Sequence, residues 1–439
     1  MRTLAEWLAL QESVHPKSID LDLTRVSAVA RTLGVAEPAF AVLTIGGTNG
    51  KGSVAAHLEA LLAARGARTG LFTSPHFIRY NERIRLCGRE IDDAALVAAF
   101  ERIEAARGAT TLTFFEYNTL AALLLFAQGG VDVAVLEVGL GGRLDATNLV
   151  DADVAVLASV GLDHRDYLGD TLEAIGAEKA GIFRAGRAAV LGTAHLPASV
   201  YAALEQRGAR AVIAERDFSW REHGTHWDYA GLGAALTGLR PSALAGAIQY
   251  RNAATALAAM QSLTADPQAR PATAALARRL AVLDAVRVNA ALAAVRLAGR
   301  FQIVPGPVEW ILDIAHNEPA AQVLTAQLRA RALPAAAGGA KGRTFAVIGV
   351  LQDKDAPAIA AALAPVIDRW IACALPGPRG GTGAQLAARL NLPAARVELA
   401  PSVVAGCELA RAAARPGDRV VVCGSVYTVG PALDWLRIY

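Results

Sequence analysis

The stretch FAVLTIGGTNGKGSVAAHLEALLAARG, residues 40–66, joins a short apolar run, a glycine-rich turn and an alanine- and leucine-rich segment that ends at a glycine. This order predicts a buried strand over 40–45, a loop, and a helix over 53–65 that stops at Gly66. The glycines of the loop allow positive φ angles and a close approach of the backbone to a ligand. Residues 40–66 therefore predict the first strand–loop–helix unit of an α/β fold.

Apolar runs of the same kind recur along the chain, each followed by a turn and a helical stretch. They are VDVAVLEVG, ADVAVLASV and AAVLG before residue 200, and WILDIA, TFAVIGV, WIACAL and RVVVCGSV after residue 300. Continuous apolar runs that alternate with helices are typical of parallel sheets covered on both faces. We therefore predict an α/β protein.

The length of the chain, 439 residues, exceeds what one core usually organises, so we expect two or three domains. Alanine-rich helical segments continue to about residue 299, and RFQIVPGPVEW then brings two prolines and a glycine before the apolar runs resume. We place an N-terminal domain at 1–296, a linker at 297–309 and a C-terminal domain at 310–439. Residues 331–343, ALPAAAGGAKGRT, are expected to form a flexible surface loop.

Composition favours a cytoplasmic protein with small-molecule partners. The formal net charge is +3, which gives no electrostatic reason to expect nucleic acid or an acidic membrane surface as a partner. No uncharged apolar run reaches the roughly 18 residues of a membrane span, and Glu6 and Glu12 interrupt the N-terminal apolar pattern, unlike a signal peptide. The four cysteines are far apart, which suggests reduced thiols rather than a zinc cage or a disulfide framework.

The glycine loop departs from the usual phosphate-loop pattern G-x-x-x-x-G-K-[ST] at two positions. Ile45 stands where the first glycine would be, and Gly52 follows Lys51 in place of a hydroxyl. Backbone N–H groups at a helix N-terminus still make an anion site, to which Lys51 adds a charge and Thr48 or Ser53 a hydroxyl. The alternative is a glycine-rich turn whose lysine is solvated.

Charged residues follow several of the apolar runs. Glu137 ends one run, and burial of its carboxylate requires either a cation or a basic partner, for which Arg143 is the alternative. Asp163 and His164 end the next run; magnesium prefers oxygen, so His164 indicates either a mixed ligand shell or a structural role. Lys179 ends a short helical segment, LEAIGAEKAGIFRAG, where a surface role is the alternative to catalysis.

The stretch WILDIAHNEPAA repeats this pattern in the second domain. Asp313 and His316 follow an apolar run, and Pro319 suits the first turn of a helix. In open α/β sheets ligands bind outside the carboxyl ends of the strands. Two domains that both present strand ends to a cleft indicate an enzyme with two substrates.

Together these motifs resemble those of the folylpolyglutamate synthase and dihydrofolate synthase family, within the ATP-dependent Mur ligase superfamily. The similarity extends from EWLALQESVHPKSIDL to VVVCGSVYTVG, and GTNGKGS is the superfamily's own form of the phosphate loop. The resemblance implies a phosphate-loop NTPase-like N-terminal domain with a mostly parallel sheet, a smaller C-terminal Rossmann-like α/β domain, and a monomer.

The resemblance also implies residue roles. It makes Lys51, Lys179 and His316 catalytic, and implies magnesium on Ser74 of the TSPH motif, Glu137 and His164. Carbamylation of Lys179 would turn it into a carboxylate that can hold a second magnesium. The ATP contacts implied by the family are Thr48, Asn49, Gly50, Lys51, Gly52, Ser53, Asn252, Arg300 and Asp313. Arg300, Asp313 and His316 belong to the linker and the second domain. Bound nucleotide would therefore draw the two domains together.

For a pterin substrate, the family pattern points to three segments of this chain. These are Asp20, Leu21, Asp22 and Leu23; Thr113, Phe114, Phe115 and Glu116; and Leu144, Asp145 and Ala146. Asp22 stands where the family usually has glycine.

The implied reaction forms an amide from a carboxylate. ATP phosphorylates the carboxylate of 7,8-dihydropteroate, or the γ-carboxylate of a folate, and the amino group of L-glutamate attacks the acyl phosphate. One alternative is another Mur-type amide ligase, which the short segment before residue 40 disfavours because those enzymes carry a separate N-terminal domain. The other alternative is a regulatory phosphate-loop NTPase that makes no product.

Overall fold

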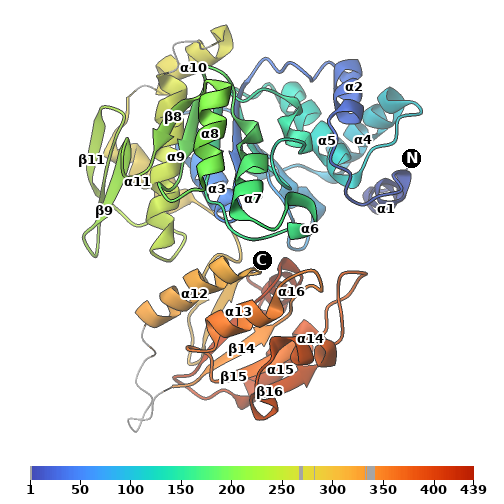
Figure 1. Ribbon diagram of the computed structural model, residues 1–439, viewed down its shortest axis with the longest axis vertical. Coiled ribbons are helices and arrows are strands. Elements are labelled where there is room, and N and C mark those ends of the chain that lie inside the picture. Colours follow the sequence, from blue (N-terminus) through green and yellow to red (C-terminus); the bar gives the residue numbers. More distant parts are fainter. Residues whose placement is uncertain (1, 266–269, 281, 332, 334–341) are drawn as a thin grey trace. The chain divides into compact units, whose positions relative to one another are not determined.

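The computed structural model describes residues 2–265, 270–280, 282–331, 333 and 342–439. These residues form two compact units, coloured by sequence in Figure 1. Unit 1 comprises Met1–Ala243 and Gln249–Val295, and unit 2 comprises Leu244–Ile248 and Arg296–Tyr439. Most of the surface loop predicted at 331–343 lies outside the described residues.

Unit 1 is built on an eight-stranded sheet whose middle strand is β1 (Ala41–Gly46). β1 lies between β5 (Val133–Glu137) and β6 (Val154–Leu157), parallel to both. The full order is β4-β3-β2-β5-β1-β6-β7-β8, in which only β3 and β4 run antiparallel to their neighbours. The outer strands are β2 (Thr69–Phe72), β3 (Ile84–Leu86), β4 (Arg89–Glu90), β7 (Ala188–Leu191) and β8 (Arg210–Ile213).

Alternate residues of β1 enter different cores, as the period of two in a strand requires. Leu43 and Ile45 share a core with α3 (Lys51–Ala63), α9 (Ile248–Thr264) and α11 (Ala285–Ala294). Val42 faces the opposite core, which includes residues of α5 (Phe114–Gly129). Both faces of the sheet are therefore covered, as the continuous apolar runs predicted.

Residues of α1, α2 and α4 belong to the core that contains Val42, and residues of α10 belong to the core that contains Leu43. Figure 1 shows α1, α2, α4 and α5 together at one side of the unit, near the N-terminus, and α9 and α10 at the other. The bounds are α1 (Leu4–Val14), α2 (Thr24–Leu33), α4 (Asp93–Arg107), α6 (Arg165–Leu168), α7 (Leu172–Lys179), α8 (Ala198–Arg207) and α10 (Pro271–Leu280), with 3₁₀ turns at Tyr80–Arg83, Ala146–Leu149 and Ala180–Ile182.

A separate antiparallel sheet, which the sequence analysis did not anticipate, follows β8. It consists of β9 (Phe218–Glu222), β10 (Trp227–Gly231) and β11 (Ala234–Leu239), in the order β11-β10-β9. Trp227 and Tyr229 of β10 are buried in the core that contains α9 and α11. The sheet is thus anchored to the body of unit 1 by one of its faces.

Unit 2 contains a six-stranded sheet in the order β12-β13-β17-β14-β15-β16, parallel except for β12. Its strands are β12 (Gln302–Val304), β13 (Glu309–Asp313), β14 (Thr344–Ile348), β15 (Arg369–Cys373), β16 (Val397–Ala400) and β17 (Arg419–Cys423). Its helices are α12 (Glu318–Ala330), α13 (Ala356–Leu363), α14 (Gly383–Leu390), α15 (Val403–Ala413) and α16 (Val426–Trp435), with a 3₁₀ turn at Ala394–Arg396. The predicted α/β class is confirmed.

Three details differ from the sequence expectations or refine them. Helix α3 begins at Lys51 and ends at Ala63, so it starts and stops two residues earlier than predicted; the left-handed Gly50 starts it directly. The expected linker at 297–309 contains β12, which pairs with β13. Pro319 does occupy the first turn of α12.

None of the helices in the described ranges combines the length and the hydropathy that a membrane crossing requires.

Candidate active site

The glycine loop between β1 and α3 is held in shape by the segment that follows β6. The Thr48 N–H donates to Ser159 O at 2.9 Å, and the Thr48 hydroxyl donates to Gly161 O at 3.1 Å. The Asn49 N–H donates to Ser159 Oγ at 3.0 Å, and this hydroxyl donates in turn to Asn49 O. Ser159, which was not predicted from the sequence, therefore fixes the loop from the segment that follows β6.

The glycines of this loop are required by both conformation and space. Gly47 and Gly50 have φ angles of 143° and 89°, which L side chains rarely adopt. A Cβ on Gly47 would lie 3.1 Å from Ser159 N, and a Cβ on Gly50 would lie 3.3 Å from Asn252 Oδ1. Asn252, a predicted ATP contact 200 residues away, is thus placed directly against the N-terminus of α3.

Two lysines meet at one carbonyl oxygen of the loop. Lys51 Nζ donates to Gly47 O at 3.0 Å and to Thr48 O at 3.3 Å, and Lys179 Nζ donates to Gly47 O at 3.2 Å. Lys179 is 5% exposed, so the alternative of a surface lysine is wrong. The Lys51 ammonium, beside a helix N-terminus, creates an attractive position for a polyphosphate.

Lys179 is positioned by close packing between α7 and the glycine turn after β5. A Cβ on Gly142 would lie 2.7 Å from Lys179 O, and one on Gly181 would lie 2.3 Å from Arg143 Cβ. The Arg143 N–H donates to Glu178 O, and the Arg143 guanidinium forms a 2.7 Å ion pair with the Glu178 carboxylate. Arg143 therefore pairs with Glu178, and it is not the partner that the alternative interpretation of Glu137 required.

The three predicted magnesium ligands follow strands β2, β5 and β6, whose carboxyl ends lie at one edge of the sheet. Glu137 is 4% exposed, and the Ser74 N–H donates to its Oε2 at 3.3 Å, which brings the serine beside the carboxylate. His164 has a left-handed backbone, with its N–H bonded to Asp163 Oδ1 at 2.9 Å. A hydroxyl, a carboxylate and an imidazole fit a hard divalent cation with a mixed shell.

The predicted pterin segments are joined by Arg25, which the sequence analysis missed. Arg25 Nη1 lies 2.9 Å from Asp20 Oδ2 and 3.4 Å from Asp22 Oδ2, and Arg25 Nη2 lies 3.3 Å from Glu116 Oε1. Asp22 also accepts bonds from the Thr24 N–H and hydroxyl at the start of α2. The aspartate that replaces the usual glycine therefore accepts hydrogen bonds from the first residue of α2 and is one of three carboxylates around Arg25.

Glu116 is buried at the start of α5. It forms a capping box with Thr113, with Thr113 N donating to Glu116 Oε2 at 2.7 Å. Burial raises the pKa of the Glu116 carboxyl against the lowering effects of the Thr113 hydrogen bond and of Arg25. The carboxylate thus depends on these partners to stay ionised.

Aromatic packing connects the second pterin segment with the strand that carries Glu137. The Phe115 ring lies 5.6 Å from the Phe72 ring, and a Cβ on Gly139 would lie 2.5 Å from Phe115 Cζ. Leu21, Leu23, Phe114 and Leu144 are half-buried and Ala146 is buried.

Asp145, a predicted substrate contact, braces its own loop. Its carboxylate accepts bonds from the Leu140 N–H at 2.8 Å and from the Thr147 N–H and hydroxyl at 3.0 and 2.6 Å. Burial raises the pKa of Asp145, and these hydrogen bonds oppose that rise. The side chain therefore shapes the turn that the third pterin segment belongs to.

In unit 2, the predicted nucleotide residues gather at the end of β13. The Asp313 carboxylate accepts bonds from the Phe301 N–H at 2.8 Å and the Ala315 N–H at 2.9 Å. Burial raises the pKa of Asp313, and the charges of Arg300 and His316 oppose that rise. Asp313 thus ties the turn carrying Arg300 to the loop carrying His316.

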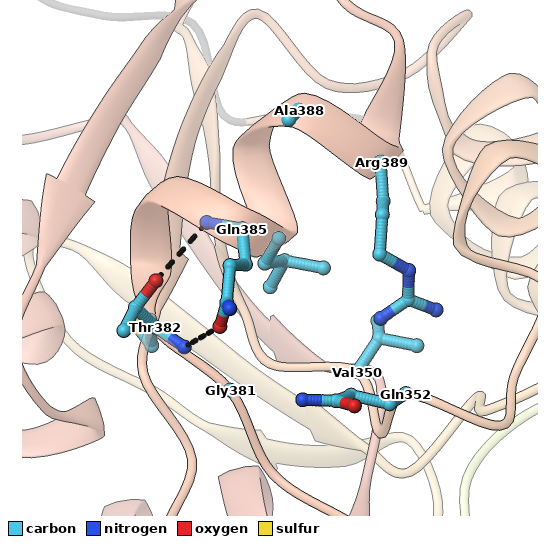
Figure 2. Close-up of a pocket in the computed structure, with 9 residues that line it drawn as sticks. Val350, Gln352, Gly381, Thr382, Gln385, Ala388 and Arg389 are labelled. Carbon is cyan, nitrogen blue, oxygen red and sulfur yellow. Dashed lines mark hydrogen bonds between the residues drawn. The ribbon is translucent and has the colours of Figure 1, made fainter.

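Unit 2 also contains a pocket of about 390 Å³ at the carboxyl ends of β14 and β15, shown in Figure 2. Its polar lining is occupied by internal bonds: Thr382 and Gln385 form a capping box, and Arg389 donates to the carbonyl of Leu351 at 3.2 Å. The described residues that line it include none of the predicted site residues. We therefore do not assign the catalytic site to this pocket.

His57 is a buried histidine on α3, one turn after Ser53. Its Nδ1 lies 2.7 Å from Ser53 O, and its Nε2 lies 2.9 Å from Ser242 Oγ. Burial lowers the pKa of His57 to about 4. The imidazole is therefore a neutral crosslink between the phosphate-loop helix and the end of the first segment of unit 1.

The stability of unit 1 is expected to depend on this crosslink below neutral pH. As pH falls below about 6.5, His57 becomes protonated in the unfolded chain, whereas in the folded protein it stays neutral down to about pH 4. The free energy of unfolding therefore decreases between these two pH values. The decrease in unfolding temperature from pH 7.5 to pH 5 should therefore be smaller in His57→Gln, whose side chain cannot be protonated, than in the wild type. An equal decrease in unfolding temperature in both proteins would contradict this role. The pKa of His76 is also lowered to about 4, but His76 is present in both proteins and contributes equally to the two decreases.

Comparison with known proteins extends this picture to families. The Mur ligase middle domain matches residues 45–214, and the Mur ligase glutamate ligase domain matches residues 299–426. The dihydrofolate synthase/folylpolyglutamate synthase of Escherichia coli (strain K12) is 43% identical over 98% of this chain and 95% of its own. The protein of the same name from Haemophilus influenzae is 38% identical over 97% of this chain and 96% of its own.

Solved structures agree with these relatives. A structure described as E. coli FolC in complex with DHPP and ADP has a TM-score of 0.89 and 41% identity, over 99% of this chain and 98% of that one. A bifunctional folylpolyglutamate synthase/dihydrofolate synthase with Mn, AMPPNP and L-glutamate bound has a TM-score of 0.87 and 38% identity, over 100% and 99%. The chain therefore belongs to the dihydrofolate synthase/folylpolyglutamate synthase family of Mur ligases.

Proposed function

We propose that the protein is an ATP-dependent ligase that joins L-glutamate to 7,8-dihydropteroate and to the γ-carboxylate of folates. The observation that carries this proposal is the placement of the Lys51 ammonium at Gly47 O and Thr48 O, beside the N-terminus of α3. That position suits the β- and γ-phosphates of ATP, and relatives of the family have been solved with ADP and AMPPNP.

ATP and a divalent metal are the cofactors. Thr48, Asn49, Gly50, Gly52 and Ser53 would present the loop and the first turn of α3 to the phosphates. Ser74, Glu137 and His164 would hold magnesium, which when bound neutralises charge on the phosphoryl oxygens. Asn252 would contact the nucleotide from α9, as its place against Gly50 suggests.

We further propose that the neutral amine of Lys179 adds CO₂ and releases a proton to give a carbamate, and that the resulting carboxylate holds a second magnesium. The Lys179 amine is buried next to the phosphate loop, where a cation without a phosphate ligand is costly and an anion would complement bound metal. Carbamylation reverses the charge at this position without changing the residue.

For the acceptor, we propose that the pteroyl group binds against Asp20–Leu23, Thr113–Glu116 and Leu144–Ala146. Arg25 would position Asp20 and Glu116 rather than contact the reacting atoms. From unit 2 we propose Arg300 and Asp313 as nucleotide contacts and His316 as a catalytic residue. Phosphoryl transfer needs mainly positioning and charge neutralisation, and attack by the glutamate amine then requires that water be kept from the acyl phosphate. A cytoplasmic monomer is the state that we propose for the enzyme.

The test of this function is ADP release with ATP and magnesium present, adding dihydropteroate and L-glutamate singly and together. We expect sustained release only when both are present, with dihydrofolate formed in equal amount. Sustained release that needs neither substrate would instead favour a regulatory NTPase. A dependence on other amino acids or acceptors would favour a different Mur-type ligase.

The Lys179 proposal predicts a specific pattern of loss and rescue. Lys179→Ala is expected to lower kcat by about 100-fold, because the site loses the carboxylate that carries one metal. A small carboxylic acid such as acetate or formate should partly restore activity to Lys179→Ala, since it can occupy the vacated volume. It should leave the wild type unchanged. Loss of activity without any rescue, together with no dependence of the wild type on bicarbonate, would argue against the carbamate.

A further inference from the structure

Three potential metal ligands converge on the turn between β9 and β10. They are His223, His226 and Asp228, in the sequence HGTHWD, and their ligand atoms all lie within 4.8 Å of one another. His223 Nε2 lies 3.0 Å from Asp228 Oδ2, and the two imidazole rings stack with centroids 4.9 Å apart at 21°. Proposed ATP, magnesium and pterin contacts lie elsewhere in the chain.

The scaffold behind these side chains is fixed. Trp227 and Tyr229 are buried, so the alternation of the strand directs His226 and Asp228 to the opposite, outer face of β10. Trp227 Nε1 also donates to Arg240 O at 2.9 Å. The neighbours of the metal ligands are therefore locked into the core.

The ligands themselves are oriented by the backbone. The Gly238 N–H donates to Asp228 Oδ1 at 2.9 Å, leaving Oδ2 toward His223, and the His223 N–H donates to His226 O at 2.8 Å. Hydrogen bonds that orient a ligating carboxylate in this way are typical of built metal sites.

We propose that His223, His226 and Asp228 form a second, peripheral metal site, and that the metal ion it binds is Zn²⁺. Two imidazole nitrogens and one carboxylate oxygen suit zinc, whereas magnesium prefers a ligand set dominated by oxygen. Zinc would insert between His223 and Asp228 and keep water as its fourth ligand. Both of these side chains are 34% exposed, which leaves the metal an open path and the side chains room to close on it.

The positive charge of Arg221 is expected to weaken zinc binding at this site. Arg221 is the register partner of Asp228 across the β9–β10 pair, so a positive charge shares the neighbourhood of the carboxylate. The site is therefore expected to bind a single zinc ion reversibly and to brace the turn, rather than to be needed for folding.

The test is a zinc titration of the full chain against a chromogenic chelator. Excess magnesium is present throughout to occupy the proposed magnesium site at Ser74, Glu137 and His164. The wild type should bind one more equivalent of zinc than the double variant His223→Asn/His226→Asn, and Asp228→Asn should weaken that equivalent at least tenfold. His195→Asn, which changes another exposed histidine, should bind like the wild type. Equal zinc stoichiometry and affinity in wild type and double variant would overturn the proposal, and matching unfolding temperatures without zinc would show that the variants are folded.

Discussion

Replacement of Lys51 by alanine is expected to lower kcat for ADP formation by about 100- to 1000-fold, the usual cost of removing one preorganised group that stabilises developing charge. The Lys51 ammonium is held by Gly47 O and Thr48 O at the position where the γ-phosphoryl would be transferred. Because this charge counts most in the transition state, the loss should appear in kcat more than in the KM for ATP. Steady-state kinetics with saturating dihydropteroate and L-glutamate measures the effect.

The matched control for Lys51 is Arg31→Ala, which removes an exposed cation from α2. Its activity should equal that of the wild type, and both variants should keep the wild-type unfolding temperature in the absence of ATP. Wild-type turnover in folded Lys51→Ala would mean that the glycine loop does not hold the phosphate that is transferred.

Replacement of Glu137 by glutamine is expected to remove about 3 kcal/mol of transition-state stabilisation, or roughly 100-fold in kcat. Glutamine keeps the size of the side chain and an oxygen that can still accept the Ser74 N–H bond. The change therefore isolates the negative charge, which a divalent cation needs and a hydrogen bond does not. Magnesium titrations of the rate should show a half-saturating concentration at least tenfold higher in the variant.

Glu101→Gln, on the exposed face of α4, is the corresponding control and should leave the magnesium dependence unchanged. If Glu137→Gln loses activity while its magnesium dependence stays that of the wild type, the carboxylate acts structurally and does not bind metal.

Much of the fold followed from patterns that are local in sequence. The apolar runs that end at Glu137 and Asp313 are strands buried on both faces, so the residues between their charged ends are all apolar and the signal is strong. The β9–β11 sheet was not predicted because only alternate residues such as Trp227 and Tyr229 are buried, while the outer face carries polar residues such as Asp228 and its partner Arg221. The domain limits at 296 and 310 remain a prediction, although β12 shows that the segment between them is partly structured.

The candidate site divides in the same way. Glycine turns and charged strand ends mark Lys51, Glu137 and Asp313 in the sequence itself, because a buried charge in an apolar run needs a reason. The proximity of Lys179 to Gly47 is tertiary, and family resemblance was what pointed to it. Arg25 and Ser159 gave no signal: each is a common residue in an ordinary helix or loop, and its importance lies in partners more than 90 residues away.

The position of β1 between β5 and β6 has a thermodynamic consequence. The loop and the proposed metal ligands come from strands that are distant along the chain and adjacent only in the assembled sheet. A ligand that bridges them cannot be held by any partly unfolded form, so its binding energy adds to the stability of the whole of unit 1 rather than of one segment. At a concentration 100 times its dissociation constant, such a ligand would raise the free energy of unfolding of the entire sheet by about 2.7 kcal/mol. Nucleotide occupancy would then set how long this protein survives proteolysis, so that its lifetime would follow the supply of ATP.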